Sequence, residues 1–495
     1  EVETPNLDRL AENGIRFTQF YNAARCCPTR ASLISGCYPH QTGIGHMTNT
    51  PTNHEHHDLG IPQYRGFLNK NSVTLAEVLK EAGYTTLMTG KWHLGIRDKE
   101  KWPLQRGFDK FYGLVPGASN FFKPVHPRGI TYMNDSIKVT DDDYYTTDAF
   151  TEYAIEFINE SQEENKEKPF FLYLAYTAPH WPIQAPKEVV DKYIGKYMDG
   201  WGAMREKRFE KMKEMGLIDE NWDLTEKDAR DWNSLSQEKK EEMDLRRALY
   251  SAMIDRMDQN IGKLVDNLDK KGILDNTVIV FLNDNGACAE FSELGSGPAE
   301  LLNTKEGYIL SYGRAWANAS NTPYREYKHW VHEGGIATPF IVHWPKGIPE
   351  SENGSICREY GFLPDVMSTF VDIADAEYPE TYNGNEIVPH SGKSLLPLFE
   401  GKKERIHTEP IFWEHEGNKA VRLGKYKLVS KWNTESETDW ELYDMETDRT
   451  ETNDLAEEMP EKVEEMSKMY DEWAENNNVL PWTEIQRLYK EKRES

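Results

Sequence analysis

The chain has 495 residues, 84 of them acidic and 58 basic, which gives a formal net charge of −26 at pH 7. A surface this negative repels nucleic-acid phosphates and anionic membranes, so the charge argues against a protein that binds nucleic acid or a membrane surface. No apolar run reaches the roughly 18 residues that a membrane-spanning helix needs. An anionic substrate would require a local pocket of Lys, Arg and His to overcome the overall field.

Two helices are predicted near the start of the chain. The first begins at Pro5, because proline suits the first helical turn and the following Leu7 and Leu10 share one face. The second begins at the adjacent Cys26 and Cys27, where backbone N–H groups favour an anion. No targeting segment can be read before Pro5, and we expect an upstream piece of this domain.

Short runs of apolar, β-branched and aromatic residues predict buried parallel strands at 84–90, 170–176, 277–284 and 338–344. Helical patterns lie before, between and after these runs, at 73–82, 238–271 and 363–374. The alternation is the β-α-β rhythm of a doubly wound sheet. We therefore predict an α/β fold, in which a large, doubly wound, mostly parallel sheet domain spans residues 1–400.

Two further segments differ from this pattern in composition and in the spacing of their apolar residues. Residues 187–240 are dense in Lys, Glu, Asp, Met and Trp, and predict an inserted helical excursion with a solvated face. Residues 401–495 predict a smaller α+β domain, because alternating patterns at 409–432 and 440–448 suggest an antiparallel sheet and a charged helix follows at 460–476.

Polar residues follow the predicted strands, where ligands bind in open α/β sheets. They are Lys91 and His93 after the first run, His180 after the second, Asp284 and Asn285 at the third, and Lys328 shortly before the fourth. Taken singly, each has an ordinary explanation; an Asp-Asn-Gly, for example, is most often a turn. Their joint placement at strand ends predicts one converging site.

Several blocks carry a family resemblance. Cys26, Pro28 and Arg30 match the pattern Cys-x-Pro-x-Arg, and "TGKWHLG", "APHWP", "NDNG" and "KHWVHEGG" follow in family order. The sequence resembles the formylglycine-dependent sulfatases of the arylsulfatase family, within the alkaline phosphatase superfamily. The resemblance covers nearly the whole chain, selects Cys26 over Cys27, and implies a periplasmic or extracellular location.

The resemblance implies a sulfatase whose nucleophile is a formylglycine, formed from Cys26 by a maturation enzyme. A hydroxyl of the hydrated aldehyde would attack sulfur, and the second hydroxyl would then let the aldehyde re-form and expel sulfate. Arg30 and Lys91 would hold the nucleophile and sulfate, and His93 would take a proton during sulfate release. His180 and Lys328 would face the leaving oxygen, with His180 favoured as general acid.

A calcium ion is the expected cofactor, since Asp284 and Asn285 offer the oxygen ligands that Ca2+ prefers, with the residue at Cys26 as a further ligand. The family adds two adjacent aspartates from its first strand, and no such pair precedes Cys26. We expect the first strand to lie upstream; the alternative is a metal-poor, degenerate relative. The acidic stretch 140–147 is no substitute, because it is predicted as a polar loop.

The substrate is less determined than the reaction. Candidate substrate-binding residues are Trp181, His415, Glu416, Asn418 and Arg422. His415 and Glu416 could instead tie the two domains together, and Trp181 could be a packing residue. A sulfated carbohydrate or aryl sulfate is expected; the alternatives are a phosphonate or phosphate monoester hydrolase of the same superfamily and a non-catalytic relative that binds anionic glycans.

Overall fold

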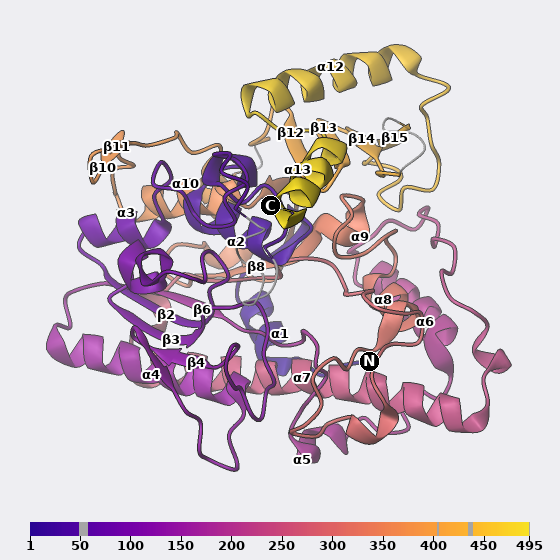
Figure 1. Cartoon of the computed structure of the whole chain (residues 1–495), viewed down its shortest axis with the longest axis horizontal. Coiled ribbons are helices and arrows are strands. Elements are labelled where there is room, and N and C mark those ends of the chain that lie inside the picture. The colour runs from indigo at the N-terminus through magenta and orange to yellow at the C-terminus, as the bar shows by residue number, and fades with distance from the viewer. Residues whose placement is uncertain (49–57, 403–404, 434–438, 495) are drawn as a thin grey trace.

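The computed structural model describes residues 1–48, 58–402, 405–433 and 439–494 (Figure 1). It confirms the predicted α/β class. Helices pack around a central system of mixed sheets, and a small antiparallel sheet near the C-terminus lies apart from it. Of the helices in these described ranges, none combines the length and apolar character that a bilayer crossing requires.

The central sheet system has two parts. One has four strands in the order β7 (Ile279–Leu282), β8 (Ala337–His343), β1 (Ile15–Tyr21) and β9 (Ser355–Phe362). The other has five, in the order β5 (Asp135–Ile137), β4 (Ile130–Tyr132), β3 (Lys110–Leu114), β2 (Thr85–Lys91) and β6 (Phe170–Ala175). All four predicted runs form strands, at β2, β6, β7 and β8.

Strand direction agrees with the prediction in two of these runs, 84–90 and 170–176. Strand β2 runs parallel to both β3 and β6. Strand β8 is antiparallel to both of its neighbours, β1 and β7, and β8 is the only described strand that pairs with β7. The prediction of parallel strands at 277–284 and 338–344 is therefore wrong. An apolar run reports burial on both faces of a sheet and carries no information about chain direction.

A slot separates the two parts of the sheet system. Strands β6 and β7 are terminal strands, and within the described ranges no strand pairs with the outer edge of either. Both line one cavity of about 1890 Å³, whose walls also include residues of the helices on either side. Every residue of β7 and most of β6 are only half-buried, although their side chains are apolar. The slot therefore exposes two sheet edges that β-strands normally cover.

The helices before residue 400 are α1 (Pro5–Glu12), α2 (Cys26–Ser35), α3 (Leu75–Glu81), α4 (Thr146–Glu164), α5 (Lys187–Val190), α6 (Gly200–Glu214), α7 (Gln237–Lys270), α8 (Gly313–Asn321), α9 (Glu333–Ile336), α10 (Pro364–Ile373) and α11 (Leu396–Phe399). Of these, α1, α3, α4 and α10 pack on strands of the central sheet system, whereas α5 packs on α7 and α6 packs on α8 (Figure 1). The longest, α7, starts where the hydroxyl of Ser236 accepts a hydrogen bond from the backbone N–H of Lys239.

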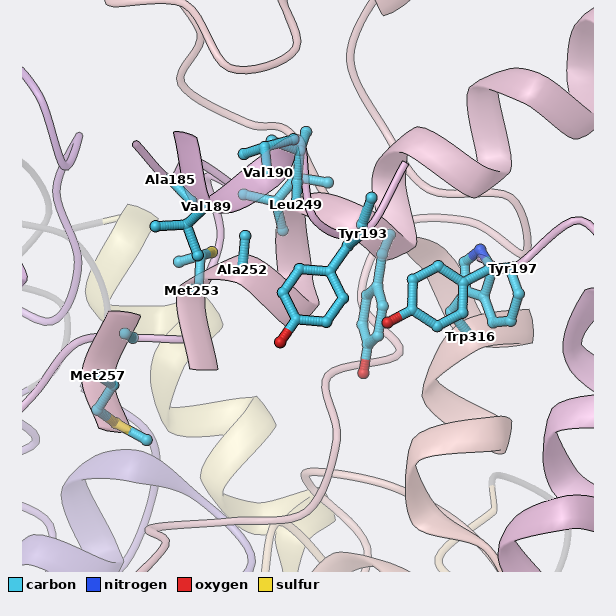
Figure 2. Close-up of a cluster of buried hydrophobic side chains, with 14 of the residues drawn as sticks. Ala185, Val189, Val190, Tyr193, Tyr197, Leu249, Ala252, Met253, Met257 and Trp316 are labelled. Carbon is cyan, nitrogen blue, oxygen red and sulfur yellow. The ribbon is translucent and has the colours of Figure 1, made fainter. Parts of the chain in front are cut away.

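The excursion at 187–240 is α-helical in α5, in α6 and, from Gln237, in the start of α7, and it is not simply a solvated face. Figure 2 shows Val189, Val190 and Tyr193 packed against Leu249 of α7 and its neighbours. Trp201 is completely buried in the same cluster. The few apolar residues of this segment are spaced among many charged ones, so the sequence pattern does not show their shared face. That face packs into a large hydrophobic core.

The predicted C-terminal sheet and helix are both present. Four antiparallel strands lie in sequence order: β12 (Ile411–His415), β13 (Asn418–Leu423), β14 (Tyr426–Ser430) and β15 (Trp440–Asp444). Helix α12 (Pro460–Asn476) packs on this sheet, and α13 (Trp482–Glu494) follows (Figure 1). A separate two-stranded ribbon joins β10 (Thr381–Tyr382) and β11 (Asn385–Glu386). The division at residue 400 stays a prediction.

A buried charge network joins the small sheet to the helix α9. The Lys427 ammonium on β14 lies 3.0 Å from Glu333 of α9 and 2.8 Å from Glu451. Arg449 also contacts Glu333, at 2.8 Å. All four side chains are at most 2% exposed, so each charge depends on its partners for stabilisation.

Candidate active site

Sheet topology and one helix start bring the predicted residues together. Lys91 is the last residue of β2, His180 follows β6, and Asp284 follows β7. Cys26 is the first residue of α2, and the extended backbone of Arg25 leads into it. The site therefore forms at the carboxyl ends of β2, β6 and β7, facing a helix N-terminus.

The two adjacent cysteines have different surroundings. Cys26 faces polar groups: its sulfur lies 3.4 Å from Oδ1 of Asn285 and contacts His93 and His180. Burial alone would raise the pKa of this thiol, but Lys91, Lys328 and the two histidines outweigh burial and hold the pKa well below its ordinary value. Cys27 packs in an apolar core, and burial raises its pKa to about 11. Only Cys26 lies in a reactive environment.

Arg30 is fixed beside Cys26 by three groups. Its Nε and Nη2 donate to Oδ2 of Asp284 at 3.1 and 2.8 Å, and its Nη1 donates to the carbonyl of Lys91 at 2.8 Å. The hydroxyl of Tyr173 on β6 lies 3.3 Å from the same Nη1. The guanidinium is therefore held in one orientation before any anion arrives, which favours catalysis by fixed charge.

His93 has a defined neutral form. Its Nε2 lies 2.9 Å from the carbonyl oxygen of Thr48, which can only accept, so Nε2 carries the hydrogen and Nδ1 has a free lone pair. Burial lowers the pKa of His93 to about 4, which keeps the ring neutral. The ring needs Gly117, since a Cβ there would lie 2.5 Å from its Cε1. Nδ1 is thus the nitrogen available to accept a proton near Cys26.

His180 and Lys328 form a pair on the other side of Cys26. The carbonyl of Trp181 accepts from Nδ1 of His180 at 2.7 Å, which leaves Nε2 as an acceptor. Nζ of Lys328 lies 3.4 Å from that Nε2. Burial, with Lys328 next, lowers the pKa of His180. The imidazole is therefore neutral here, and the proton of the pair resides on Lys328.

Glu290 is a site residue that the sequence analysis missed. Its Oε1 lies 2.9 Å from Nη2 of Arg25 and 3.1 Å from Nζ of Lys328, and its Oε2 accepts from Nε1 of Trp181 at 2.7 Å. Burial raises the pKa of the Glu290 carboxyl, but Lys328 and Arg25 outweigh burial and lower it. No motif marks this loop position, so only the fold reveals it.

Asp284 and Asn285 present oxygen donors next to Cys26, and their chemistry fits Ca2+. Their loop is held because Gly286 donates to the carbonyl of Gly335 at 3.0 Å, and a Cβ on Gly286 would lie 1.8 Å from a backbone oxygen. These two residues, even with the predicted third ligand at Cys26, do not complete the six to eight oxygens that Ca2+ takes. Further ligands must come from outside these residues.

The predicted substrate residues do not form one group. Arg422 is 2% exposed and donates to the hydroxyl of Tyr21, so it offers a substrate no free surface, and the prediction that it contacts substrate is not supported. Asn418 is also buried and donates to Nε2 of His329 at 3.4 Å.

His415 and Glu416 lie together with His329. Their possible metal-ligand atoms are within 4.8 Å of one another. However, the Asn418 amide makes Nε2 of His329 an acceptor, so its Nδ1 carries a hydrogen and donates toward Glu416 at 3.4 Å. Hydrogen bonding explains this cluster better than a metal ion does. Trp181 alone of the five lies directly beside the reactive groups, with its ring centroid 4.7 Å from that of His180.

Comparison with known proteins finds sulfatases. A family model described as "Sulfatase" matches residues 1–376, and one described as "N-sulphoglucosamine sulphohydrolase, C-terminal" matches residues 326–477. An uncharacterised sulfatase of Schizosaccharomyces pombe is 34% identical over 495 residues, which covers 94% of this chain and 88% of the relative. An arylsulfatase of Klebsiella aerogenes is 32% identical, covering 81% and 88%.

A solved structure adds a neighbour with a bound oligosaccharide. The protein Ps i-CgsB in complex with k-i-k-neocarrahexaose superimposes with a TM-score of 0.71 at 25% identity. The match covers 96% of this chain and 88% of that one.

Proposed function

This chain belongs to the sulfatase family and is a sulfuric ester hydrolase, and we propose that it acts through a formylglycine made from Cys26 by a maturation enzyme. The substrates are sulfate esters of glycans or aryl alcohols. One observation carries the proposed mechanism: fixed cations and two neutral imidazoles surround Cys26, while Cys27 faces the core. A periplasmic or extracellular location is part of the proposal and rests on the family resemblance alone.

The hydrated formylglycine would supply a hydroxyl that attacks sulfur and an aldehyde that can re-form as sulfate leaves. The Cys26 sulfur stands where that hydroxyl oxygen would lie. Arg30 and Lys91 then stabilise the charge on the peripheral sulfate oxygens, because Asp284 already holds the guanidinium in place. Nδ1 of His93 accepts the proton released when the aldehyde re-forms.

The leaving alcohol lies on the side of His180 and Lys328. His180 is neutral in this structure, so we propose that Lys328 and His180 act as one acid, with the ammonium proton passing through Nε2 to the leaving oxygen. This refines the expectation that His180 alone is the acid. The 3.4 Å contact between the two nitrogens supports it.

We propose that Ca2+ completes the site, held by Asp284 and Asn285 and neutralising sulfate charge. The missing carboxylate ligands would come from a strand outside residues 1–495 that fills the slot between β6 and β7. The slot supports this, since β6 and β7 both end at the Cys26 site and no described strand pairs with the outer edge of either. A strand between them would also end there.

The test of the proposal is the chemical state of Cys26. After coexpression with a maturation enzyme, peptide mass spectrometry should find an aldehyde at Cys26 and an intact thiol at Cys27. Cys26→Ala should abolish sulfatase activity, and Cys27→Ala should keep it, provided the variant folds. An aldehyde at Cys27, or an active Cys26→Ala enzyme, would overturn the mechanism.

A further inference from the structure

Three aromatic side chains gather beside His180, and we call them the aromatic platform: Trp181, Phe291 and Tyr308. The ring centroid of Trp181 lies 5.4 Å from that of Phe291 and 6.5 Å from that of Tyr308, both in edge-on arrangements. Phe291 is 53% exposed and Tyr308 is 43% exposed. Large rings exposed next to a reactive centre commonly mark a binding surface.

Phe291 occupies a conformation that stability alone does not explain. Its φ is +83°, in the left-handed region that bulky side chains avoid because of steric strain. Half of its apolar ring nevertheless faces water. Strained residues persist where their surroundings hold them and concentrate at ligand-binding positions. Neither the backbone strain nor the exposure of the Phe291 ring stabilises the fold.

Glu290 connects the platform to the residues at the leaving oxygen. It precedes Phe291, accepts from the indole N–H of Trp181 at 2.7 Å, and contacts Lys328 at 3.1 Å. The position of the Trp181 ring is therefore tied to that of Lys328. Because Glu290 already accepts the only N–H of Trp181, the ring has no hydrogen-bond donor left for a ligand.

The chemistry of these surfaces limits what they can bind. Trp181 and Phe291 can offer only ring faces and edges, which pair well with another flat ring. Tyr308 adds a single hydroxyl, so a ligand with many hydroxyls gains little polar contact from this surface, whereas a flat ring gains contact with all three side chains. The platform thus favours an aromatic or otherwise flat apolar group.

We propose that the aromatic platform is the subsite for the alcohol part of the sulfate ester, and that it selects a flat apolar ring. The inference rests on the proposed function, because His180 and Lys328 define the side on which the alcohol leaves. Trp181 adjoins His180, so the first ring of the alcohol would lie against Trp181. A second fused ring would extend over Phe291 and Tyr308.

Binding to the inert Cys26→Ala protein tests this without turnover. Isothermal titration calorimetry should give a Kd for 2-naphthyl sulfate about 2- to 10-fold lower than that for phenyl sulfate, the range expected of one aromatic contact. Adding Phe291→Ala or Tyr308→Ala should remove that preference. Adding Ile194→Ala, which truncates an apolar side chain that is 54% exposed in another segment, should leave it unchanged.

The outcomes separate the subsite from the reaction. Equal binding of the two esters, or a preference that survives both aromatic substitutions, would overturn the subsite. A matured wild-type enzyme that binds the esters and releases no sulfate would instead refute the proposed function. If Phe291→Ala does not fold, Phe291→Gly relieves the positive φ and removes the same ring.

Discussion

Nζ of Lys328 lies 3.4 Å from Nε2 of His180. Nε2 is the nitrogen that would have to carry a proton if His180 acted as an acid by itself. In the proposed acid, the proton is therefore held by Lys328, and Nε2 of His180 faces it as the acceptor. The leaving oxygen would receive it from the pair, and the contribution of the pair depends on how badly the alcohol needs a proton.

The first prediction concerns this pair. Sugar alcohols need a proton to leave, whereas 4-nitrophenolate leaves almost unaided. His180→Ala should cut kcat for a sugar sulfate by about 10²- to 10⁴-fold and should harm 4-nitrophenyl sulfate much less. Lys328→Ala should show the same selectivity. Steady-state kinetics on both esters provides the measurement.

Equal losses on the two esters would contradict this assignment, because they would indicate that the residue binds sulfate rather than assisting the alcohol. Selective loss in Lys328→Ala but not in His180→Ala would leave Lys328 as the sole acid.

Glu290 gives the second prediction. Burial lowers the pKa of Lys328, but Cys288, Cys26 and, after them, Glu290 raise it and together outweigh burial. Glu290→Gln removes a negative charge, so the pKa of Lys328 should fall and the alkaline limb of the pH profile of kcat/KM should move to lower pH. Loss of charged hydrogen bonds should also cost about 10- to 100-fold in kcat/KM.

Glu293→Gln is the matched control. It makes the same change three residues later, where the carboxylate pairs with Arg230 at the surface. A purely structural role for Glu290 would lower activity without moving the alkaline limb, and that result would refute its role in positioning Lys328.

The sequence predicted the elements with strong periodicity and missed those without it. The run at 84–90 became β2 with an offset of one residue, since a strand buried on both faces has a continuous apolar signature. Strand β9 was not predicted, because its "SICREYGF" places Arg358 and Glu359 within a mostly half-buried strand. The direction of β8 depends on tertiary pairing, which local pattern does not record.

The candidate site shows the same division. The family motifs identified Cys26 and the residues around it, because each of these residues belongs to a recognisable sequence block. Glu290 lies in a loop without a recognisable motif, and its importance comes from three contacts with residues distant in sequence or separated by a turn. Burial of Arg422 depends on how the small sheet docks, which no local pattern records.

The third prediction concerns the buried network between the small sheet and α9. Lys427→Met would leave Glu333 and Glu451 buried without their shared cation, which should cost about 3–5 kcal/mol in the free energy of unfolding. Lys425→Met, on the exposed side of the hairpin, should change little. Urea unfolding at pH 7 compares the two.

The same network gives a pH dependence of stability. Burial raises the pKa of the Glu333 carboxyl, and Lys427 and Arg449 outweigh burial and lower it from 4.5 to about 2. Because the folded-state pKa is depressed, this contribution is fully present above pH 4.5 and is lost as the pH falls toward 2. The wild-type protein should therefore lose more stability between pH 5 and pH 3 than Lys427→Met does; equal losses would contradict the assignment.

The last prediction concerns both the proposed Ca2+ ion and the slot between β6 and β7. Asp284 and Asn285 alone supply too few oxygens for tight Ca2+ binding, so residues 1–495 should bind Ca2+ weakly, in the range of about 10⁻⁴ M or above. A longer chain that supplies the proposed strand should bind Ca2+ more tightly, and chelation should abolish its sulfatase activity until Ca2+ is restored.

In that longer chain, amide hydrogens of β6 and β7 should exchange more slowly than in residues 1–495. Those of β3, which is already paired on both sides, should not change. Asp284→Asn should weaken Ca2+ binding and leave the added protection of β6 and β7 intact, because the strand and the ion use different contacts. Activity restored by Zn2+ alone would refute the calcium site, and unchanged exchange in the longer chain would show that the slot has another occupant.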